Sequence, residues 1–154
     1  MSLLNDLDTR LLVDLLRDRM KPQKSLGQHF LVDDSVITRA IEIVSEKSNS
    51  LNSDSHVLEI GPGPGSLSLE ILKSGAKLTA IEIDMESVLH LNRVFTDLES
   101  QLTIIEQDAL IGNWPQGLTH IISNLPYQIS SPILEKIQNY DLKTPLCCIV
   151  LLVQ

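Results

Sequence analysis

Five short apolar runs rich in valine, leucine and isoleucine recur through residues 56–153, and helix-like stretches separate most of them. The runs read "HVLEI", "KLTAIEID", "QLTIIEQD", "THIISN" and "PLCCIVLLV". Strands that alternate with helices are typical of a parallel sheet covered by helices. The pattern therefore predicts an α/β fold with a doubly wound, mostly parallel sheet and helices over roughly residues 66–73, 85–98 and 131–140.

The first 55 residues have a different pattern. Leucines from Leu4 to Leu16 recur at helical spacing, and "KP" at residues 21–22 ends that helix. After "KSLGQHFL" (residues 24–31), Asp33 or Asp34 is expected to cap a second helix. We therefore divide the chain into an N-terminal helical extension, residues 1–55, and a core, residues 56–154.

Composition limits the classes of protein. The chain has 154 residues, 43% hydrophobic and 21% charged, with a formal net charge of -8, so a nucleic-acid partner must be met locally. Charges interrupt the first leucines too often for a signal peptide or a membrane span, and we expect a cytoplasmic protein without a membrane partner. Cys147 and Cys148 match neither disulfide nor metal-ligand spacing, so we expect two buried apolar side chains and no metal.

The turn after the first predicted strand, "LEIGPGPGSL", carries alternating glycines at Gly61, Gly63 and Gly65. Glycines let backbone N–H groups approach a ligand at the edge where parallel strands end. In a dinucleotide fingerprint, two residues separate the second glycine from the third. In this chain only Pro64 separates Gly63 from Gly65, and a proline has no N–H group to donate. The loop favours a ligand without phosphates, and the simpler alternative is a tight turn.

Carboxylates follow the next two predicted strands. Glu82 stands where a carboxylate can accept hydrogen bonds from ribose hydroxyls, and Asp108 can accept one from an exocyclic amine. Asp84 is expected to cap the helix that starts at Met85. Neighbouring strand ends converge in a doubly wound sheet, so these residues predict a nucleoside site for NAD or S-adenosylmethionine, and the glycine spacing favours the latter.

The stretch "SNLPYQISSP" follows the fourth predicted strand, and Ser131 with Pro132 is expected to begin the last helix. Asn124, together with the backbone carbonyl of Leu125 or Pro126, can accept hydrogen bonds from an exocyclic NH2, and Tyr127 can stack on the base that carries it. These hydrogen bonds favour a pyramidal nitrogen whose lone pair can attack a sulfonium methyl group. This motif predicts methyl transfer to an amino-bearing base.

With these motifs in order, the sequence resembles the ribosomal RNA adenine N6,N6-dimethyltransferase family, relatives of the erythromycin-resistance methyltransferases. The resemblance covers residues 24–134 and rests above all on "SLGQHFL" combined with "SNLPYQISSPI". It implies a Rossmann-like methyltransferase core with strand order 3-2-1-4-5, S-adenosylmethionine as cofactor, and small-subunit ribosomal RNA, in the immature subunit, as partner. Residues 24–31 would cover the cofactor.

The resemblance also implies roles for individual residues. Asn124, Pro126 and Tyr127 would form the catalytic clamp. The cofactor would be held by Gln28, His29, Leu31, Gly61, Gly63, Glu82, Ile83, Asp108, Ala109 and Asn124. Lys21, Lys24 and Arg39 are candidates for local phosphate contacts.

The last predicted strand ends one residue before the chain does, and the family continues with more strands and a small helical domain. We therefore expect a C-terminally truncated chain. Two other functions stay open: a non-catalytic RNA-binding factor in small-subunit assembly, and a 23S ribosomal RNA methyltransferase of the erythromycin-resistance type. An NAD-dependent oxidoreductase would need hydride-transfer residues, for which the sequence offers no candidate.

Overall fold

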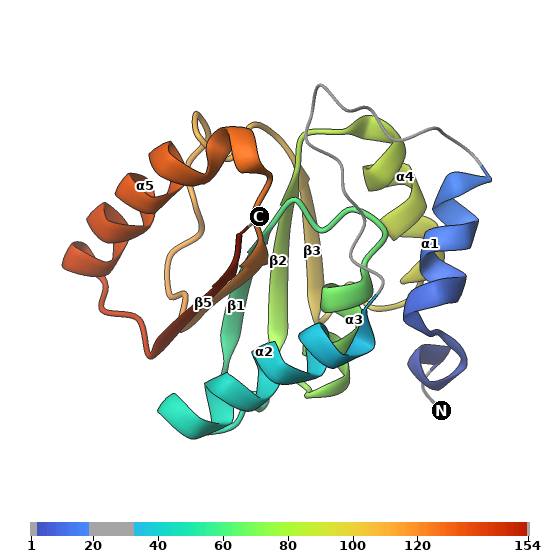
Figure 1. The fold of residues 1–154 in the computed structure, drawn as a ribbon, viewed down its shortest axis with the longest axis horizontal. Coiled ribbons are helices and arrows are strands. Elements are labelled where there is room, and N and C mark those ends of the chain that lie inside the picture. Colours follow the sequence, from blue (N-terminus) through green and yellow to red (C-terminus); the bar gives the residue numbers. More distant parts are fainter. Residues whose placement is uncertain (1–2, 19–32, 154) are drawn as a thin grey trace.

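A five-stranded, all-parallel sheet forms the centre of the structure, a computed structural model that describes residues 3–18 and 33–153 (Figure 1). The strand order is β3-β2-β1-β4-β5. The strands are β1 (His56–Ile60), β2 (Lys77–Glu82), β3 (Leu102–Glu106), β4 (His120–Asn124) and β5 (Cys148–Leu152). The predicted α/β fold and its strand order 3-2-1-4-5 are confirmed.

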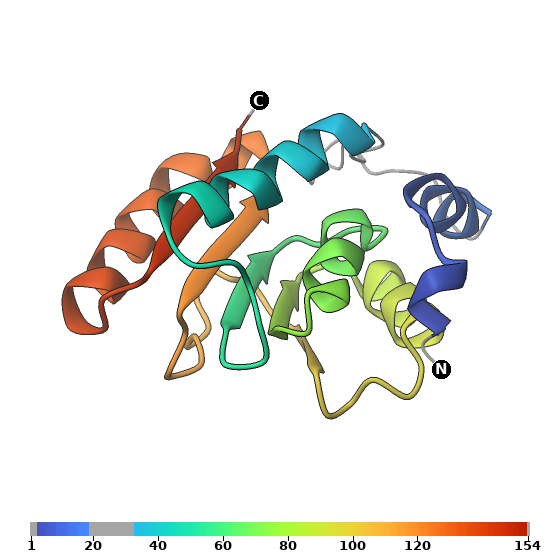
Figure 2. The same cartoon turned by 90° about the horizontal axis from the view of Figure 1, so that it is seen from below.

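Helices cover both faces of this sheet. Figure 2 shows α5 on one side and α2, α3 and α4 on the other, with α1 packed outside α3 and α4. The helices are η1 (Leu3–Asp6), α1 (Thr9–Arg17), α2 (Asp34–Lys47), α3 (Ser66–Lys73), α4 (Met85–Val94), η3 (Tyr127–Ile129) and α5 (Ser130–Lys143). None of these described helices has the length and apolar character needed to cross a bilayer.

Aspartates begin three of the helices, because each carboxylate accepts a hydrogen bond from a first-turn N–H that has no partner within the helix. Asp8 accepts from Leu11 N at 2.8 Å, which divides the leucine-rich N-terminal pattern into η1 and α1. Asp33 caps α2, and Asp84 caps α4 by accepting from Ser87 N at 2.8 Å. The predicted caps at Asp33 and Asp84 are therefore confirmed.

Two predicted helix boundaries are wrong. The helix from Met85 ends at Val94 rather than near residue 98, because Asp97 has a left-handed backbone with φ 65°. Ser131 does not cap α5, because the turn η3 leads directly into Ser130 and Ile129 is the capping residue. Pro132 therefore lies inside the first turn, where its missing N–H leaves no intrahelical bond unmade.

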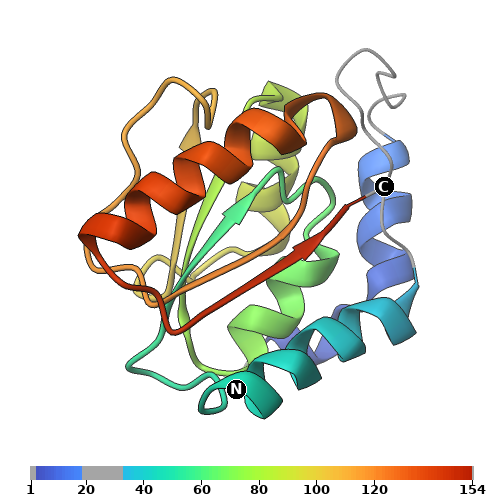
Figure 3. The ribbon, with the colours of Figure 1, turned by 60° about the vertical axis from the view of Figure 1, so that its left-hand side comes forward.

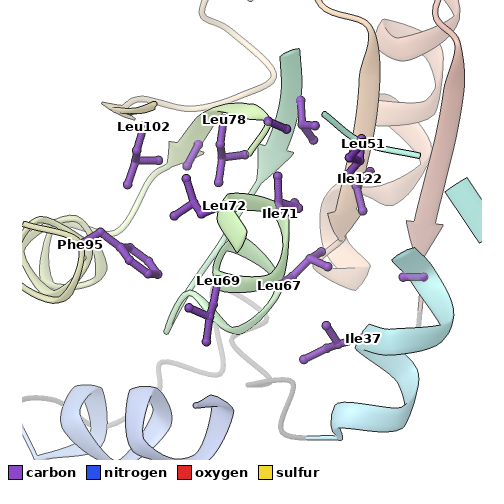
Figure 4. Close-up of a cluster of buried hydrophobic side chains, with 14 of the residues drawn as sticks. Ile37, Leu51, Leu67, Leu69, Ile71, Leu72, Leu78, Phe95, Leu102 and Ile122 are labelled. Atoms are coloured by element: carbon purple, nitrogen blue, oxygen red, sulfur yellow. The ribbon is translucent and has the colours of Figure 1, made fainter. Parts of the chain in front are cut away.

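The core has two halves, one on each face of the sheet. Figure 4 shows the larger half, in which side chains of α3 such as Leu69 and Leu72 meet Leu78 of β2 and Phe95. α2 adds Ile37 to this half, so a helix of the predicted extension shares the core of the sheet. The boundary between residues 55 and 56 stays a prediction.

The second half of the core lies under α5 and includes Ile133, Ile137 and Trp114. β5 lies at the edge of the sheet, and only Val150 of its five residues is buried. Cys147 is exposed and Cys148 is half-buried, so the prediction of two buried cysteines is wrong. Cys147 precedes β5 and Cys148 is its first residue, so neither lies at the middle of the strand, where Val150 is buried.

Glu59 brings a carboxyl group into the interior between β1 and α3. It is 2% exposed and accepts a hydrogen bond from the hydroxyl of Ser68. Burial raises the pKa of Glu59 to about 8, against the opposing effect of the Ser68 hydrogen bond, and the nearby charge of Glu82 adds to the rise. Near neutral pH the folded protein therefore holds a proton on Glu59 that the unfolded chain has lost.

We predict that Glu59→Gln reduces the dependence of stability on pH. The folded-state pKa is above the ordinary value of 4.5, so stability is highest below pH 4.5 and falls as the pH rises through about 8. Between pH 5.5 and 8.5 the free energy of unfolding of the parent should fall by about 3 kcal/mol from this group, and the neutral amide should remove most of that fall. Urea denaturation at both pH values measures the change.

Glu135→Gln is the matched control, because Glu135 lies exposed on α5 and should leave the slope unchanged. An unchanged slope in Glu59→Gln would contradict the prediction.

A second prediction concerns Gly65, which joins the loop after β1 to α3. Its φ is +96°, and a Cβ there would lie 2.8 Å from the Phe95 ring and 3.0 Å from Leu91. Gly65→Ala should therefore lower the free energy of unfolding by about 2–4 kcal/mol, from backbone strain and overpacking together.

Gly117→Ala separates the two causes, since Gly117 has φ +78° and nothing within 4 Å of an added Cβ. That variant should lose only the backbone part, about 1–2 kcal/mol. Equal losses in the two variants, measured by urea denaturation, would show that the Phe95 contact contributes nothing.

Candidate active site

The glycine loop, residues 61–65, leaves β1 in a conformation that L side chains rarely adopt. Gly61, Gly63 and Gly65 have φ of 66°, 55° and 96°. Gly61 N donates to Ile81 O at 2.8 Å, so the start of the loop stays joined to β2. The three alternating glycines therefore occupy positions whose backbone conformation favours a residue without a side chain.

Glu82 ties the end of β2 to this loop. Its two carboxylate oxygens accept hydrogen bonds from Gly63 N at 3.0 Å and from Asp84 N at 3.1 Å. The residue is 5% exposed. Burial raises the pKa of Glu82, and the hydrogen bonds from Gly63 and Asp84 oppose that rise. One side chain therefore fixes the glycine loop and the turn into α4, and its predicted binding of ribose stays a prediction.

Ile83 follows Glu82 at the same strand end and is 53% exposed. An exposed isoleucine beside a buried carboxylate offers an apolar surface at the rim of the sheet. The predicted role of Ile83 in cofactor binding stays a prediction.

Asp108 lies just beyond β3 and begins a compact turn. Its Oδ1 accepts from Leu110 N at 2.9 Å, and its backbone carbonyl accepts from Ile111 N and Gly112 N at 3.1 and 3.0 Å. Ala109 is buried, and its carbonyl accepts from Trp114 Nε1 at 3.0 Å. The half-buried Asp108 carboxylate has acceptor capacity left for a ligand amine.

The acceptor turn, residues 124–127, follows β4. Leu125 is 2% exposed, and its N–H donates to Leu152 O at 2.9 Å, which joins the turn to β5. Pro126 lies beside Gly61, where an added Cβ would be 3.7 Å from Pro126 Cδ. The structure therefore brings the glycine loop and the acceptor turn together, as predicted from their positions after β1 and β4.

Tyr127 is 73% exposed and Asn124 is half-buried. The ring of Tyr127 is thus available to a base that arrives from solvent. The clamp roles predicted for these two side chains stay predictions.

Two residues that support the loops were not predicted. Ser123 donates its hydroxyl to Ile60 O at 2.6 Å and accepts from Ile60 N at 3.1 Å, which joins the ends of β1 and β4. His90 is fully buried on α4, and its Nε2 lies 2.7 Å from Pro64 O, so it donates to the glycine loop. In the sequence, each stands as a polar residue inside an apolar strand or helix face. That pattern indicates a buried hydrogen bond, but it does not identify the group to which the bond is made.

Several predicted residues cannot be placed. Gln28, His29, Leu31, Lys21 and Lys24 lie outside the described residues. Arg39, the remaining phosphate candidate, pairs instead with carboxylates of its own helix. Its guanidinium lies 2.7 Å from Glu46 and 3.5 Å from Glu42.

A groove with a volume of about 370 Å³ lies between α2 and α3, away from the strand ends. It is lined by Thr38, Ile41, Glu42, Ser45, Glu46 and Glu70. None of these residues belongs to the glycine loop, the acceptor turn or the ends of β2 and β3, so the groove is separate from the site. Among the described residues, no group of three or more His, Cys, Asp or Glu side chains is arranged to hold a metal ion.

Known proteins share both the sequence and the fold. "Ribosomal RNA small subunit methyltransferase A" of Parabacteroides distasonis is 41% identical over 131 residues, which cover 83% of this chain and 47% of that protein. "Probable ribosomal RNA small subunit methyltransferase A" of Haloarcula marismortui is 45% identical over 108 residues, or 69% of this chain and 36% of that protein.

Two crystal structures add to this. A dimethyladenosine transferase from Plasmodium falciparum has a TM-score of 0.67 and 28% identity, covering 82% of this chain and 43% of its own. The 23S rRNA methyltransferase ErmE has a TM-score of 0.63 and 26% identity, covering 82% and 48%. The chain spans less than half the length of these relatives.

The sequence model of one family, described as ribosomal RNA adenine dimethylase, matches residues 19–154. That match includes the glycine loop, Glu82, Asp108 and the acceptor turn, which the structure assembles at one edge of a parallel sheet. This chain belongs to the ribosomal RNA adenine dimethylase family.

Proposed function

We propose that this chain binds S-adenosylmethionine and transfers methyl groups to N6 of adenine in small-subunit ribosomal RNA, two to each of two adjacent adenines in a hairpin loop. The observation that carries the proposal is the meeting of the glycine loop and the acceptor turn, with Pro126 against Gly61. A cofactor held by the first would present its reactive group to a base held by the second. The similarity to a small-subunit ribosomal RNA methyltransferase and to a dimethyladenosine transferase supports methyl transfer to adenine in this RNA.

The residues at this edge fit the cofactor. Ser66, the first residue of α3, has a buried hydroxyl without a hydrogen-bond partner among the described residues, directly behind the glycine loop. Each carboxylate oxygen of Glu82 keeps acceptor capacity for a ribose hydroxyl. Pro62 and Pro64 lack the N–H donors that a pyrophosphate would need, which favours a ligand without phosphates. Gly61, Gly63, Ile83, Asp108 and Ala109 would complete the pocket, with Gln28, His29 and Leu31.

When bound, S-adenosylmethionine supplies an electrophilic methyl group on its sulfonium sulfur. Asn124 accepts one hydrogen bond from the adenine N6 amine, and a backbone carbonyl of the acceptor turn accepts the other. The Pro126 carbonyl already accepts from Ile129 N at 3.2 Å and keeps a second lone pair for this purpose. Tyr127 stacks on the base. The clamp orients the nitrogen lone pair toward the methyl group. Each transfer would leave S-adenosylhomocysteine and a cationic, acidic nitrogen that releases one proton to water, so no strong base is needed.

The partner in this proposal is RNA in an immature small ribosomal subunit, in the cytoplasm. An adenine must be unpaired or leave its stack to reach N6, which costs a few kcal/mol and favours a loop over a duplex. Because the chain has a formal net charge of -8, its affinity for RNA has to come from local contacts with the phosphates. The similarity to ErmE makes 23S ribosomal RNA the second candidate substrate.

We expect Glu82→Gln to weaken S-adenosylmethionine binding about 10–100-fold in calorimetric titration, because hydrogen bonds from the ligand to a charged acceptor are lost. Glu106→Gln is the matched control, since Glu106 pairs in register with Glu82 on the next strand but is exposed. A folded parent that binds no S-adenosylmethionine, or equal affinity in Glu82→Gln and the parent, would contradict the proposed site.

We expect Asn124→Ala to lower methyl transfer at least about 100-fold while cofactor affinity falls by much less, because Asn124 acts on the attacking amine. Tritiated methyl incorporation into a small-subunit ribosomal RNA fragment measures this, with a 23S fragment beside it. Asn139→Ala, on the exposed face of α5, is the control. RNA binding by the parent without methyl incorporation would favour a non-catalytic assembly factor instead.

A further inference from the structure

The connection between β3 and β4 has no helix, although it joins two strands of a parallel sheet that have β2 and β1 between them. Residues 107–119 run through turns, and three of them, Ala109, Trp114 and Leu118, enter the core on the α5 side. Figure 3 shows α5 across this face with the connection beside it. Asp108 is the second residue of this connection, so the contacts that hold the connection also affect where the Asp108 carboxylate lies.

α5 holds this connection through two polar side chains in its buried stripe. Ile133 and Ile137 are buried, and Lys136 and Tyr140 lie on the same face at helical spacing. The Tyr140 hydroxyl donates to Pro115 O at 2.8 Å and accepts from Leu118 N at 3.2 Å. A lysine in such a stripe would ordinarily extend its ammonium group into water.

Lys136 turns instead toward the start of the connection. Its Nζ donates to Ala109 O at 2.7 Å and to Gly112 O at 2.5 Å, and it lies 4.9 Å from the centre of the Trp114 ring. An ammonium group has three N–H donors. Two of them bond to the carbonyls of Ala109 and Gly112, and the positive charge also faces the Trp114 ring. The same Ala109 carbonyl also accepts from Trp114 Nε1, so it is held from two sides.

These contacts fix the peptide next to Asp108. Gly112 N donates to the Asp108 carbonyl and closes the turn. Lys136 then bonds to the carbonyls of Ala109 and Gly112, one near each end of that turn. Burial lowers the pKa of Lys136, and the charge of Asp108 opposes that shift. α5 starts directly after the acceptor turn, and one helix therefore supports both sides of the site.

We propose that Lys136 is a positioning residue that sets selectivity for adenine, by holding the Ala109 and Gly112 carbonyls so that the Asp108 carboxylate meets the exocyclic amine of the cofactor. This inference rests on the proposed function, since it assumes a cofactor with an adenine ring at Asp108. A lysine that only stabilised the fold would affect every ligand of the site alike.

The test compares two ligands, S-adenosylhomocysteine and S-inosylhomocysteine. The second carries a carbonyl oxygen in place of the exocyclic amine, so a well-placed carboxylate should reject it. In the parent chain we expect about 10–100-fold weaker binding of the inosine compound by calorimetry. In Lys136→Met, which keeps the apolar stem and removes the donors, S-adenosylhomocysteine should bind about tenfold more weakly while the inosine compound changes by less than about twofold.

Three other variants complete the experiment. Lys143→Met changes an exposed lysine of the same helix and should leave both affinities unchanged. Tyr140→Phe loosens the far end of the connection and should lower the melting temperature with the selectivity ratio retained. Trp114→Phe removes the second donor to the Ala109 carbonyl and should lower the ratio in the same direction, which keeps the test decisive if Lys136→Met does not fold.

A parent that binds both compounds equally, or a ratio that stays at the parent value in Lys136→Met and Trp114→Phe, would overturn the role of Lys136 and leave the cofactor site standing. Equal losses for both compounds in Lys136→Met would reduce Lys136 to a stabilising residue. A folded parent that binds neither compound would overturn the proposed function itself.

Discussion

The carboxylate of Glu82 is the interaction on which the site depends. Its bonds to Gly63 N and Asp84 N join a loop from β1, the end of β2 and the start of α4 through one side chain. Burial raises the pKa of this carboxyl group and so favours its neutral form. The two backbone N–H groups oppose that effect, and their directional bonds make the position of the charge specific.

Around that carboxylate, each loop is held by a bond from a different element. His90 of α4 donates to Pro64 O, Ser123 of β4 bonds to both backbone groups of Ile60, and Leu125 N donates to Leu152 O of β5. The strands provide the rigid frame, and single polar side chains hold the loop backbone in place through hydrogen bonds. This division suits a site that must hold one ligand and admit another, because the adjustable parts are short and their supports are buried.

The sequence predicted the frame well, because alternating apolar runs and glycine spacing depend on local chemistry. Strand order, the strand-end positions of Glu82 and Asp108, the Asp84 cap and the family itself are confirmed, while the ligand roles of individual side chains stay predictions. The sequence failed where the apolar pattern does not encode the backbone: Asp97 has a left-handed backbone just after the early end of α4, η3 shifts the start of α5, and Cys147 lies before β5 rather than inside it. The partners of His90, Glu59 and Lys136 lie 26, 9 and up to 27 residues away, a separation that no local pattern encodes.

The bond between Leu125 N and Leu152 O joins the acceptor turn to β5, which lies at one edge of the described sheet. Edge strands open more readily than central ones in native-state hydrogen exchange. Fraying at the end of β5 would release the backbone beside Asn124 while the glycine loop, attached to the central strands, stayed closed. The glycine loop and the acceptor turn therefore take their backbone support from different strands, so local opening of β5 would change the geometry of the acceptor turn first.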